Sequence, residues 1–314
     1  MNRLLLTTFL LLTFALSQAQ VGFRFESVEA LSPVINGEYE ENSPVYDPID
    51  KRLYFSRTLH PDNKGGKTVG QDLWYSDFDG NAWSQPSNDL NKLNNYLNNV
   101  TIGLSKDGQR MYMIGTYIKK VSLQSGFSMT EKKEDGDWPR PETVEVDNLN
   151  IKSPFYGGYI SPSEDILIIS MESFNSMGQE DLYVSLKTAN GWGKPIWMGD
   201  SINSAGYEIS PFLFEDGKTL MFASTGHGGQ GDCDIFYSYR LDSIWTSIPA
   251  KGSREFNLDA FSVPFHPESS FLEASSDIEI AAVAIFHDEQ ALGALNAFPV
   301  DDKQPRGNIL YSAQ

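Results

Sequence analysis

Short apolar stretches, each four to six residues long, alternate with turn residues along most of the chain. Three of these stretches begin at an aspartate, and two of them open with Asp-Gly: Asp50-Lys-Arg-Leu-Tyr-Phe-Ser56, Asp107-Gly-Gln-Arg-Met-Tyr-Met113 and Asp216-Gly-Lys-Thr-Leu-Met-Phe222. Asp-Gly between apolar runs favours a tight hairpin turn, because glycine accepts the positive φ that the turn needs. The pattern predicts many short antiparallel strands. The one helix-like candidate is the alanine-rich stretch 277–296.

A fixed period organises these strands. Four tryptophans are separated by 55, 54 and 53 residues, and each is followed by a proline within four residues; they are Trp83, Trp138, Trp192 and Trp245. A constant period in this range is typical of repeat proteins. Ser-Pro pairs, at Ser43-Pro44, Ser161-Pro162 and Ser210-Pro211, are interpreted as parts of each unit's first strand. Four strands per unit of about 50 residues predict the blades of an all-β propeller.

The two ends of the chain predict the number of blades. Phe25 precedes Asn36 by 11 residues, as Trp192 precedes Asn203, so Phe25 takes the tryptophan position of an incomplete blade. The stretch 308–312 resembles a third strand that lacks its fourth. We therefore expect a five-bladed propeller closed by the N-terminal strand, since closure removes the open sheet edges. An insertion of about 20 residues in the irregular region around 265–305 fits this count, and six blades are the alternative.

Aspartates recur at the start of the predicted third strands, at Asp72, Asp181 and Asp234. Their fixed place in the repeat favours backbone hydrogen bonding that pins a neighbouring loop. The alternative interpretation is a shared carboxylate site.

Charge and the N-terminal segment predict the compartment. The formal net charge is -18 and the isoelectric point is near 4.5, which argues against nucleic-acid binding. Residues 1–19 have the features of a signal peptide, leaving a mature propeller over 20–314. Cys233 is the single cysteine, so no disulfide forms within the chain. We expect an exported protein, in the periplasm or associated with the outer membrane.

Two sets of side chains are candidates for binding. Three carboxylates are placed near the starts of first strands, where the propeller axis is expected: Asp47, Glu208 and Asp259. Glycoside hydrolysis needs two carboxylates at a defined separation. Three aromatic residues fall outside the tryptophan period and suit sugar stacking or the filling of space between blades: Trp74, Trp197 and Tyr207. No residue pattern predicts a metal, a cofactor or a catalytic set.

The most regular part of the repeat runs from Ile202-Asn-Ser-Ala-Gly-Tyr-Glu-Ile-Ser-Pro-Phe212 through 215–224 to 226–236. These stretches resemble the periplasmic TolB-like (WD40-like) propeller repeats of Bacteroidetes, which are related to the propeller regions of OmpA-family envelope proteins. The resemblance implies a platform for protein-protein interaction, in some cases within secretion or gliding machinery. On this basis we expect a non-catalytic scaffold, and no enzyme, with another envelope protein as partner. The rival hypothesis is a carbohydrate-binding or glycoside-hydrolysing propeller, with a glycan as its partner.

Overall fold

The computed structural model describes residues 28–68, 70–117 and 125–227, together with the strands 234–240, 256–259, 282–287, 290–296 and 310–313. The predicted signal peptide 1–19, Phe25, Cys233 and Trp245 lie outside the described residues. Within the described part, no helix is long and apolar enough to cross a membrane.

The chain folds into sheets that follow one another along the sequence. The first blade contains β2 (Glu40–Asp47), β3 (Arg52–Thr58) and β4 (Gln71–Asp77). The second blade contains β5 (Thr101–Leu104), β6 (Arg110–Ile114), β7 (Phe127–Glu131) and β8 (Glu142–Val144). The third blade contains β9 (Tyr156–Ile160), β10 (Ile166–Met171), β11 (Asp181–Thr188), β12 (Gly191–Trp192) and β13 (Ile196–Trp197).

Two further sheets complete the described structure. The fourth blade contains β14 (Glu208–Leu213), β15 (Thr219–Ser224), β16 (Asp234–Arg240) and β17 (Phe256–Asp259). The closing sheet contains β1 (Val28–Ala30), β18 (Ala282–His287), β19 (Gln290–Asn296) and β20 (Leu310–Ala313). A 3-10 turn, η1 (Gly66–Thr68), lies in the loop between β3 and β4.

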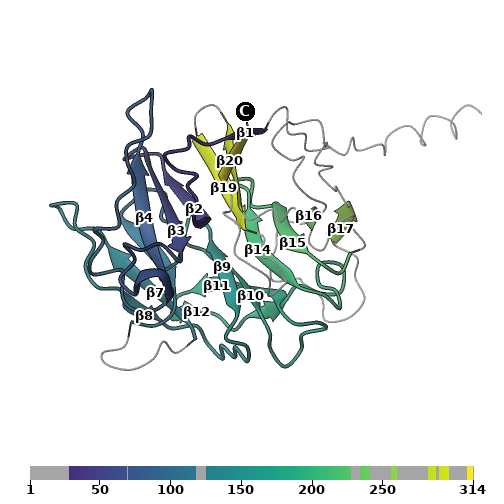
Figure 1. Cartoon of the computed structure of the whole chain (residues 1–314). Helices are drawn as coiled ribbons and strands as arrows, with labels where there is room; N and C mark the ends of the chain where they lie inside the picture. Colours follow the sequence, from purple (N-terminus) through teal and green to yellow (C-terminus); the bar gives the residue numbers. More distant parts are fainter. Residues whose placement is uncertain are drawn as a thin grey trace, which may run out of the picture.

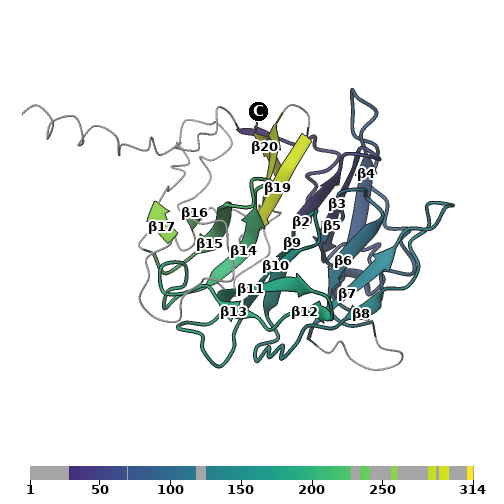
Figure 2. The ribbon, with the colours of Figure 1, turned by 180° about the vertical axis from the view of Figure 1, so that it is seen from behind.

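The innermost strands of the sheets form a ring. β2 contacts β5, β5 contacts β9, β9 contacts β14, and β19 lies between β14 and β2. Both views show β19 between β2 and β14, with the other sheets radiating outward (Figures 1 and 2). This arrangement is a β-propeller, as the repeat predicts.

The closing sheet joins the two ends of the chain. β1 pairs with β20 in antiparallel register, with Glu29 opposite Ser312, so the N-terminal strand completes the sheet as predicted. The order outward from the axis is β19, β18, β20 and β1, and β18 runs parallel to β20. The helix-like stretch 277–296 was predicted wrongly, because the described residues within it are the strands β18 and β19. Alanine in a strand packs against its neighbours, so composition did not decide this element.

The strand register corrects the interpretation of one Ser-Pro pair. Ser43 and Ser210 lie in β2 and β14 at register irregularities and adopt positive φ, 51° and 53°. Ser161 instead follows β9, because Ile160 is the last residue of β9 and pairs with Leu167. Its Oγ accepts hydrogen bonds from the Asp165 and Ile166 amides, so it closes the turn. The dipeptide alone does not distinguish these two positions.

Two of the periodic tryptophans, Trp138 and Trp192, pack between neighbouring blades. Trp138 of the second blade shares a buried cluster with Tyr54 of the first, and the two rings contact edge to face. Trp192 of the third blade shares a cluster with Tyr112 of the second. Each of these tryptophans is 3% exposed. The period of the sequence therefore reflects one large side chain that fills each of these two blade junctions.

Candidate functional site

Two of the repeated aspartates pin loops on one end of the propeller. Asp72 Oδ2 accepts a hydrogen bond from the Lys64 amide at 2.7 Å, which fixes the β3–β4 loop. Asp181 Oδ2 accepts from the Met177 amide at 2.8 Å, which fixes the β10–β11 loop. Burial raises the pKa of both carboxyls. Asp234 begins β16, but its side chain lies outside the described residues.

Asparagines fasten the loops that link one blade to the next. Asn94 makes two backbone hydrogen bonds with Leu73 of β4, accepting from its N–H at 2.8 Å and donating to its carbonyl at 2.9 Å. Asn203 makes the same pair with Leu182 of β11, at 2.6 and 3.1 Å. Both asparagines are buried. They hold each linking segment against the third strand of the blade it leaves.

Five residues after the linking asparagine, two inner strands carry a buried carboxylate. Glu208 accepts from the Ser204 amide at 2.8 Å and from Ser224 Oγ at 2.7 Å. Glu41, at the matching place in β2, accepts from Arg57 Nε at 2.9 Å. Both are 0% exposed. Burial raises the pKa of Glu41 to about 7, and the Arg57 guanidinium opposes this shift. Both carboxylates are enclosed by protein groups, and their hydrogen bonds stabilise the loops around them.

The repeat breaks at the entrance to the third blade. Three asparagines share one position in the repeat. Each lies ten residues before the inner-strand residue that pairs with the start of the second strand of the same blade; they are Asn94, Asn150 and Asn203. Asn150 is exposed, and within the described structure its amide makes no hydrogen bond. Phe155 occupies the position of the buried Glu208 and is 74% exposed. The fastening seen at Asn94 and Asn203 is therefore absent at Asn150.

The segment around Asn150 crosses the third blade instead. At its start, the Asp147 amide donates to the Trp192 carbonyl at 3.0 Å. At its end, the Lys152 amide donates to the Glu172 carbonyl at 3.0 Å. Residues 148–150 lie between these two anchors and form one wall of a groove. We call this the third-blade groove.

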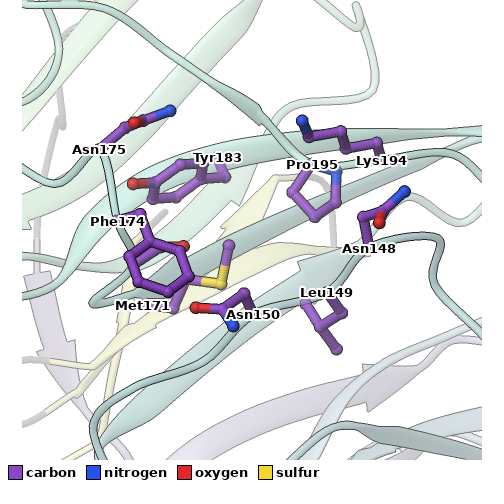
Figure 3. Close-up of a pocket in the computed structure, with 10 residues that line it drawn as sticks. Asn148, Leu149, Asn150, Met171, Phe174, Asn175, Tyr183, Lys194 and Pro195 are labelled. Carbon is purple, nitrogen blue, oxygen red and sulfur yellow. The ribbon is translucent and has the colours of Figure 1, made fainter.

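The third-blade groove is partly open to solvent and has a volume of about 470 Å³. Its lining combines amide, amine and hydroxyl groups with apolar side chains, from Asn148, Leu149, Asn150, Met171, Ser173, Phe174, Asn175, Tyr183, Lys194 and Pro195. Figure 3 shows Phe174 and Asn175 on one side, with Lys194, Pro195 and Asn148 across from them. A volume of this size is typical of small-molecule sites.

Two amides of the groove are available to a ligand. In the part of the chain that the structure describes, the amides of Asn150 and Asn175 have no hydrogen-bond partner, while Asn148 donates to Asp147. The Tyr183 hydroxyl lies 3.0 Å from Ser176 Oγ, and burial raises its pKa, so it stays protonated at neutral pH. Phe174 is 75% exposed and presents its ring to the groove. The ten lining residues include no carboxylate.

Two of the predicted axial carboxylates lie elsewhere. Asp47 is the last residue of β2, at the opposite end from Glu41, and it accepts from the amides of Ile49 and Asp50 in the turn. Asp259 ends β17, the outermost strand of its sheet, and its side chain lies outside the described residues. Glu208 does begin an inner strand. These three carboxylates do not come together, because opposite strand ends and an outer strand separate them.

The three aromatic candidates are wholly or partly buried. Trp74 is 4% exposed and donates from Nε1 to Asn63 Oδ1 at 3.0 Å, so it belongs to the core of the first blade and cannot stack on a sugar. Trp197 is half-buried and donates to Asp181 Oδ2 at 2.7 Å, beside the third-blade groove. Tyr207 is half-buried, and its backbone pairs with Thr225. None of the three lines the groove.

Sequence reasoning named one groove residue, Pro195, as the proline of the tryptophan period, and did not single out the others. A signal was present. Trp83 and Trp192 precede their linking asparagines by 11 residues, whereas Trp138 precedes Asn150 by 12. This one-residue extension marks the segment that leaves the repeat.

Comparisons with known proteins find no matching family model and no matching curated protein. Among solved structures, the chain is similar to an alpha-L-arabinofuranosidase from Lactobacillus brevis, with 12% identity, coverage of 74% of this chain and 75% of that one, and a TM-score of 0.43. It is similar to an endo-arabinase from Bacteroides thetaiotaomicron, with 12% identity, 88% and 99% coverage, and a TM-score of 0.44. It is also similar to a GH32 beta-fructofuranosidase from Bombyx mori, with 13% identity, coverage of 86% of this chain and 60% of that one, and a TM-score of 0.46.

These findings correct three predictions. The resemblance to TolB-like envelope propellers was wrong, because no family model matches and the structural neighbours named above are glycosidases. The prediction of a non-catalytic scaffold and the prediction that the chain is not an enzyme are corrected by the same neighbours. Sequence identities of 12 to 13% transfer no activity or substrate to this chain.

Proposed function

We propose that the protein is a carbohydrate-binding β-propeller whose ligand lies in the third-blade groove. The observation that carries the proposal is the loss of the repeat's fastening at Asn150 and Phe155, where the chain instead forms a groove with free amides. The asparagine hydrogen bonds that hold the linking segment after the first and third blades are missing at Asn150, next to a concave surface. This difference favours a role in binding.

The groups in the groove suit a sugar. An amide offers both a donor and an acceptor, and so does each sugar hydroxyl, so Asn150 and Asn175 can each bind a sugar hydroxyl. The exposed ring of Phe174 supplies a flat apolar surface for the C–H face of a sugar ring. Hydrolysis would in addition need two carboxylates beside the sugar. Such a pair would have to come from outside the ten lining residues.

The experiment is a glycan array probed with wild type, Phe174→Ala and Phe155→Ala. The two phenylalanines are 75% and 74% exposed, and Phe155 does not line the groove, which makes it a matched control. We expect Phe174→Ala to weaken binding about tenfold, or about 1.4 kcal/mol, and Phe155→Ala to leave it unchanged. Equal binding by all three proteins, or no glycan bound by wild type, would overturn the proposal. Mass spectrometry of the bound oligosaccharides after incubation separates binding from hydrolysis.

We also propose that the ring has five blades, with the closing sheet as the fifth. The contacts among β2, β5, β9, β14 and β19 support this count, because each inner strand touches two others in a closed sequence. Six blades would need a further inner strand between two strands that are already neighbours.

Export stays a prediction from the N-terminal segment 1–19, and so do the periplasmic or outer-membrane location and an envelope-protein partner. Cell fractionation with N-terminal sequencing tests the first two, and a mature protein that begins at Gln20 is the expected result. A full-length protein in the cytoplasm would contradict export.

A further inference from the structure

The third-blade groove has amines without acidic partners. Lys194 lines the groove, and Lys152 places its Nζ 4.2 Å from the centroid of the Phe174 ring. Among the described residues, the ion pairs of the chain include neither lysine. Both side chains are exposed. The two positive charges therefore flank the aromatic and amide surface, and neither forms an ion pair with a carboxylate in the described structure.

Four nearby acidic groups lie outside the groove lining, and one of them, Glu172, is half-buried. Asp181 accepts from Met177, Gly178 and the Trp197 indole. Glu180 is 4% exposed. Asp147 lies at the rim of the groove and accepts from Asn148 Nδ2. The groove itself thus presents positive charge, neutral amides and a hydroxyl.

This local charge is opposite to that of the whole protein. The formal net charge of -18 repels an acidic ligand at long range. Two unpaired amines in the groove offset that repulsion at short range, where screening by salt is weakest. A neutral sugar gains no ion pair from this arrangement, whereas a sugar carboxylate meets an ammonium partner.

We infer that the third-blade groove binds an acidic glycan, with the carboxylate of a uronic acid paired to Lys194 or Lys152. The inference rests on the proposed carbohydrate function and adds the chemical class of the sugar. The hydroxyls bind the free asparagine amides, the ring lies on Phe174, and the carboxylate is directed to the amines.

The test uses matched pairs of oligosaccharides made of galacturonate, glucuronate or mannuronate, each as the free acid and as its methyl ester. Titration calorimetry of the full chain compares wild type, Lys194→Met, Lys152→Met and Lys218→Met. Lys218 is exposed in the β14–β15 turn and serves as the control. We expect wild type to bind one acid at least about tenfold tighter than its ester, with added salt reducing the difference. The variant of the paired lysine, and the double groove variant Lys152→Met with Lys194→Met, should lose roughly 3-fold to 10-fold for the acid and nothing for the ester, while Lys218→Met should match wild type.

Equal binding of acid and ester, or of wild type and the double groove variant, would overturn the inference while leaving a glycan function intact. Binding of neutral glycans alone on the array would overturn it as well. A failure of the proposed function looks different, because then Phe174→Ala would match wild type on every glycan.

Discussion

Trp138 donates its indole N–H to the hydroxyl of Tyr54, 84 residues earlier in the chain, at 3.2 Å. This bond joins the second blade to the first inside a buried cluster. It gives a physical meaning to the period of the sequence, because a side chain that fills the space between blades must recur once per blade.

Removal of this tryptophan should destabilise the propeller strongly. Trp138→Ala leaves a cavity between two blades, and we expect a loss of about 3 to 5 kcal/mol in the free energy of unfolding. Tyr54→Phe keeps the packing but leaves the buried Trp138 indole N–H without its acceptor, so it should cost about 1 to 3 kcal/mol. Chemical denaturation measures both. A cost for Trp138→Ala as small as that of Tyr54→Phe would mean that the blades do not depend on this contact.

Ring closure can be trapped covalently. Glu29 of β1 lies opposite Ser312 of β20, at a Cα separation that a disulfide can span. In a Cys233→Ser background, Glu29→Cys with Ser312→Cys should oxidise readily and raise the melting temperature. Glu29→Cys with Leu310→Cys is the control, because a diagonal neighbour two residues along lies at the limit of disulfide reach. Equal crosslinking in both pairs, or in neither, would contradict the register.

The loop aspartates should separate stability from binding. Asp181→Ala and Asp72→Ala each free a loop amide, and we expect each to lose about 1 to 3 kcal/mol of stability. The β10–β11 loop pinned by Asp181 carries Phe174 and Asn175, so Asp181→Ala should also weaken glycan binding severalfold. Asp72→Ala should leave binding unchanged. Chemical denaturation measures the stability of the two variants, and calorimetry measures their glycan binding. Equal effects of the two variants on binding would contradict the proposal that the β10–β11 loop forms part of the binding site.

Glu41 should make stability depend on pH. Burial raises its pKa to about 7 from a model-peptide value of 4.5. A carboxyl whose pKa is higher in the folded state contributes stability that is fully present below pH 4.5 and is lost as the pH rises through about 7. The melting temperature of wild type relative to Glu41→Gln should therefore be higher at pH 5 than at pH 8.

The control for this pH profile is Glu215→Gln, an exposed carboxyl in the β14–β15 turn, which should show no such trend. A wild-type advantage over Glu41→Gln that grows with pH would show that Arg57 dominates, and that the Glu41 pKa is lowered in the folded protein.

The sequence predicted those parts of the molecule that repeat. Hairpin turns, the tryptophan period and the loop aspartates each recur with a fixed spacing, so pattern alone located Trp138, Trp192, Asp72 and Asp181. The closing pair of strands followed from the unmatched strands at the two ends. The groove could not be found in this way, because it is formed where Asn150 and Phe155 depart from the repeat. The 12-residue spacing from Trp138 to Asn150 marks the place of this departure, but it does not predict what the segment forms instead.

The positions of the candidate axial carboxylates were predicted wrongly for a related reason. A repeat gives the order of the strands, but a shift of a few residues moves a side chain from one end of a strand to the other. Asp47 and Glu208 are both buried and both belong to inner strands, yet they lie at opposite strand ends. Their place became known from the register of β2 and β14.

The most direct test of the account is a crystal structure of the protein with an oligosaccharide that binds it on the array. The account predicts a sugar ring in the third-blade groove against Phe174, with hydroxyls hydrogen-bonded to Asn150 or Asn175. A sugar bound at another surface, with the third-blade groove empty, would contradict it.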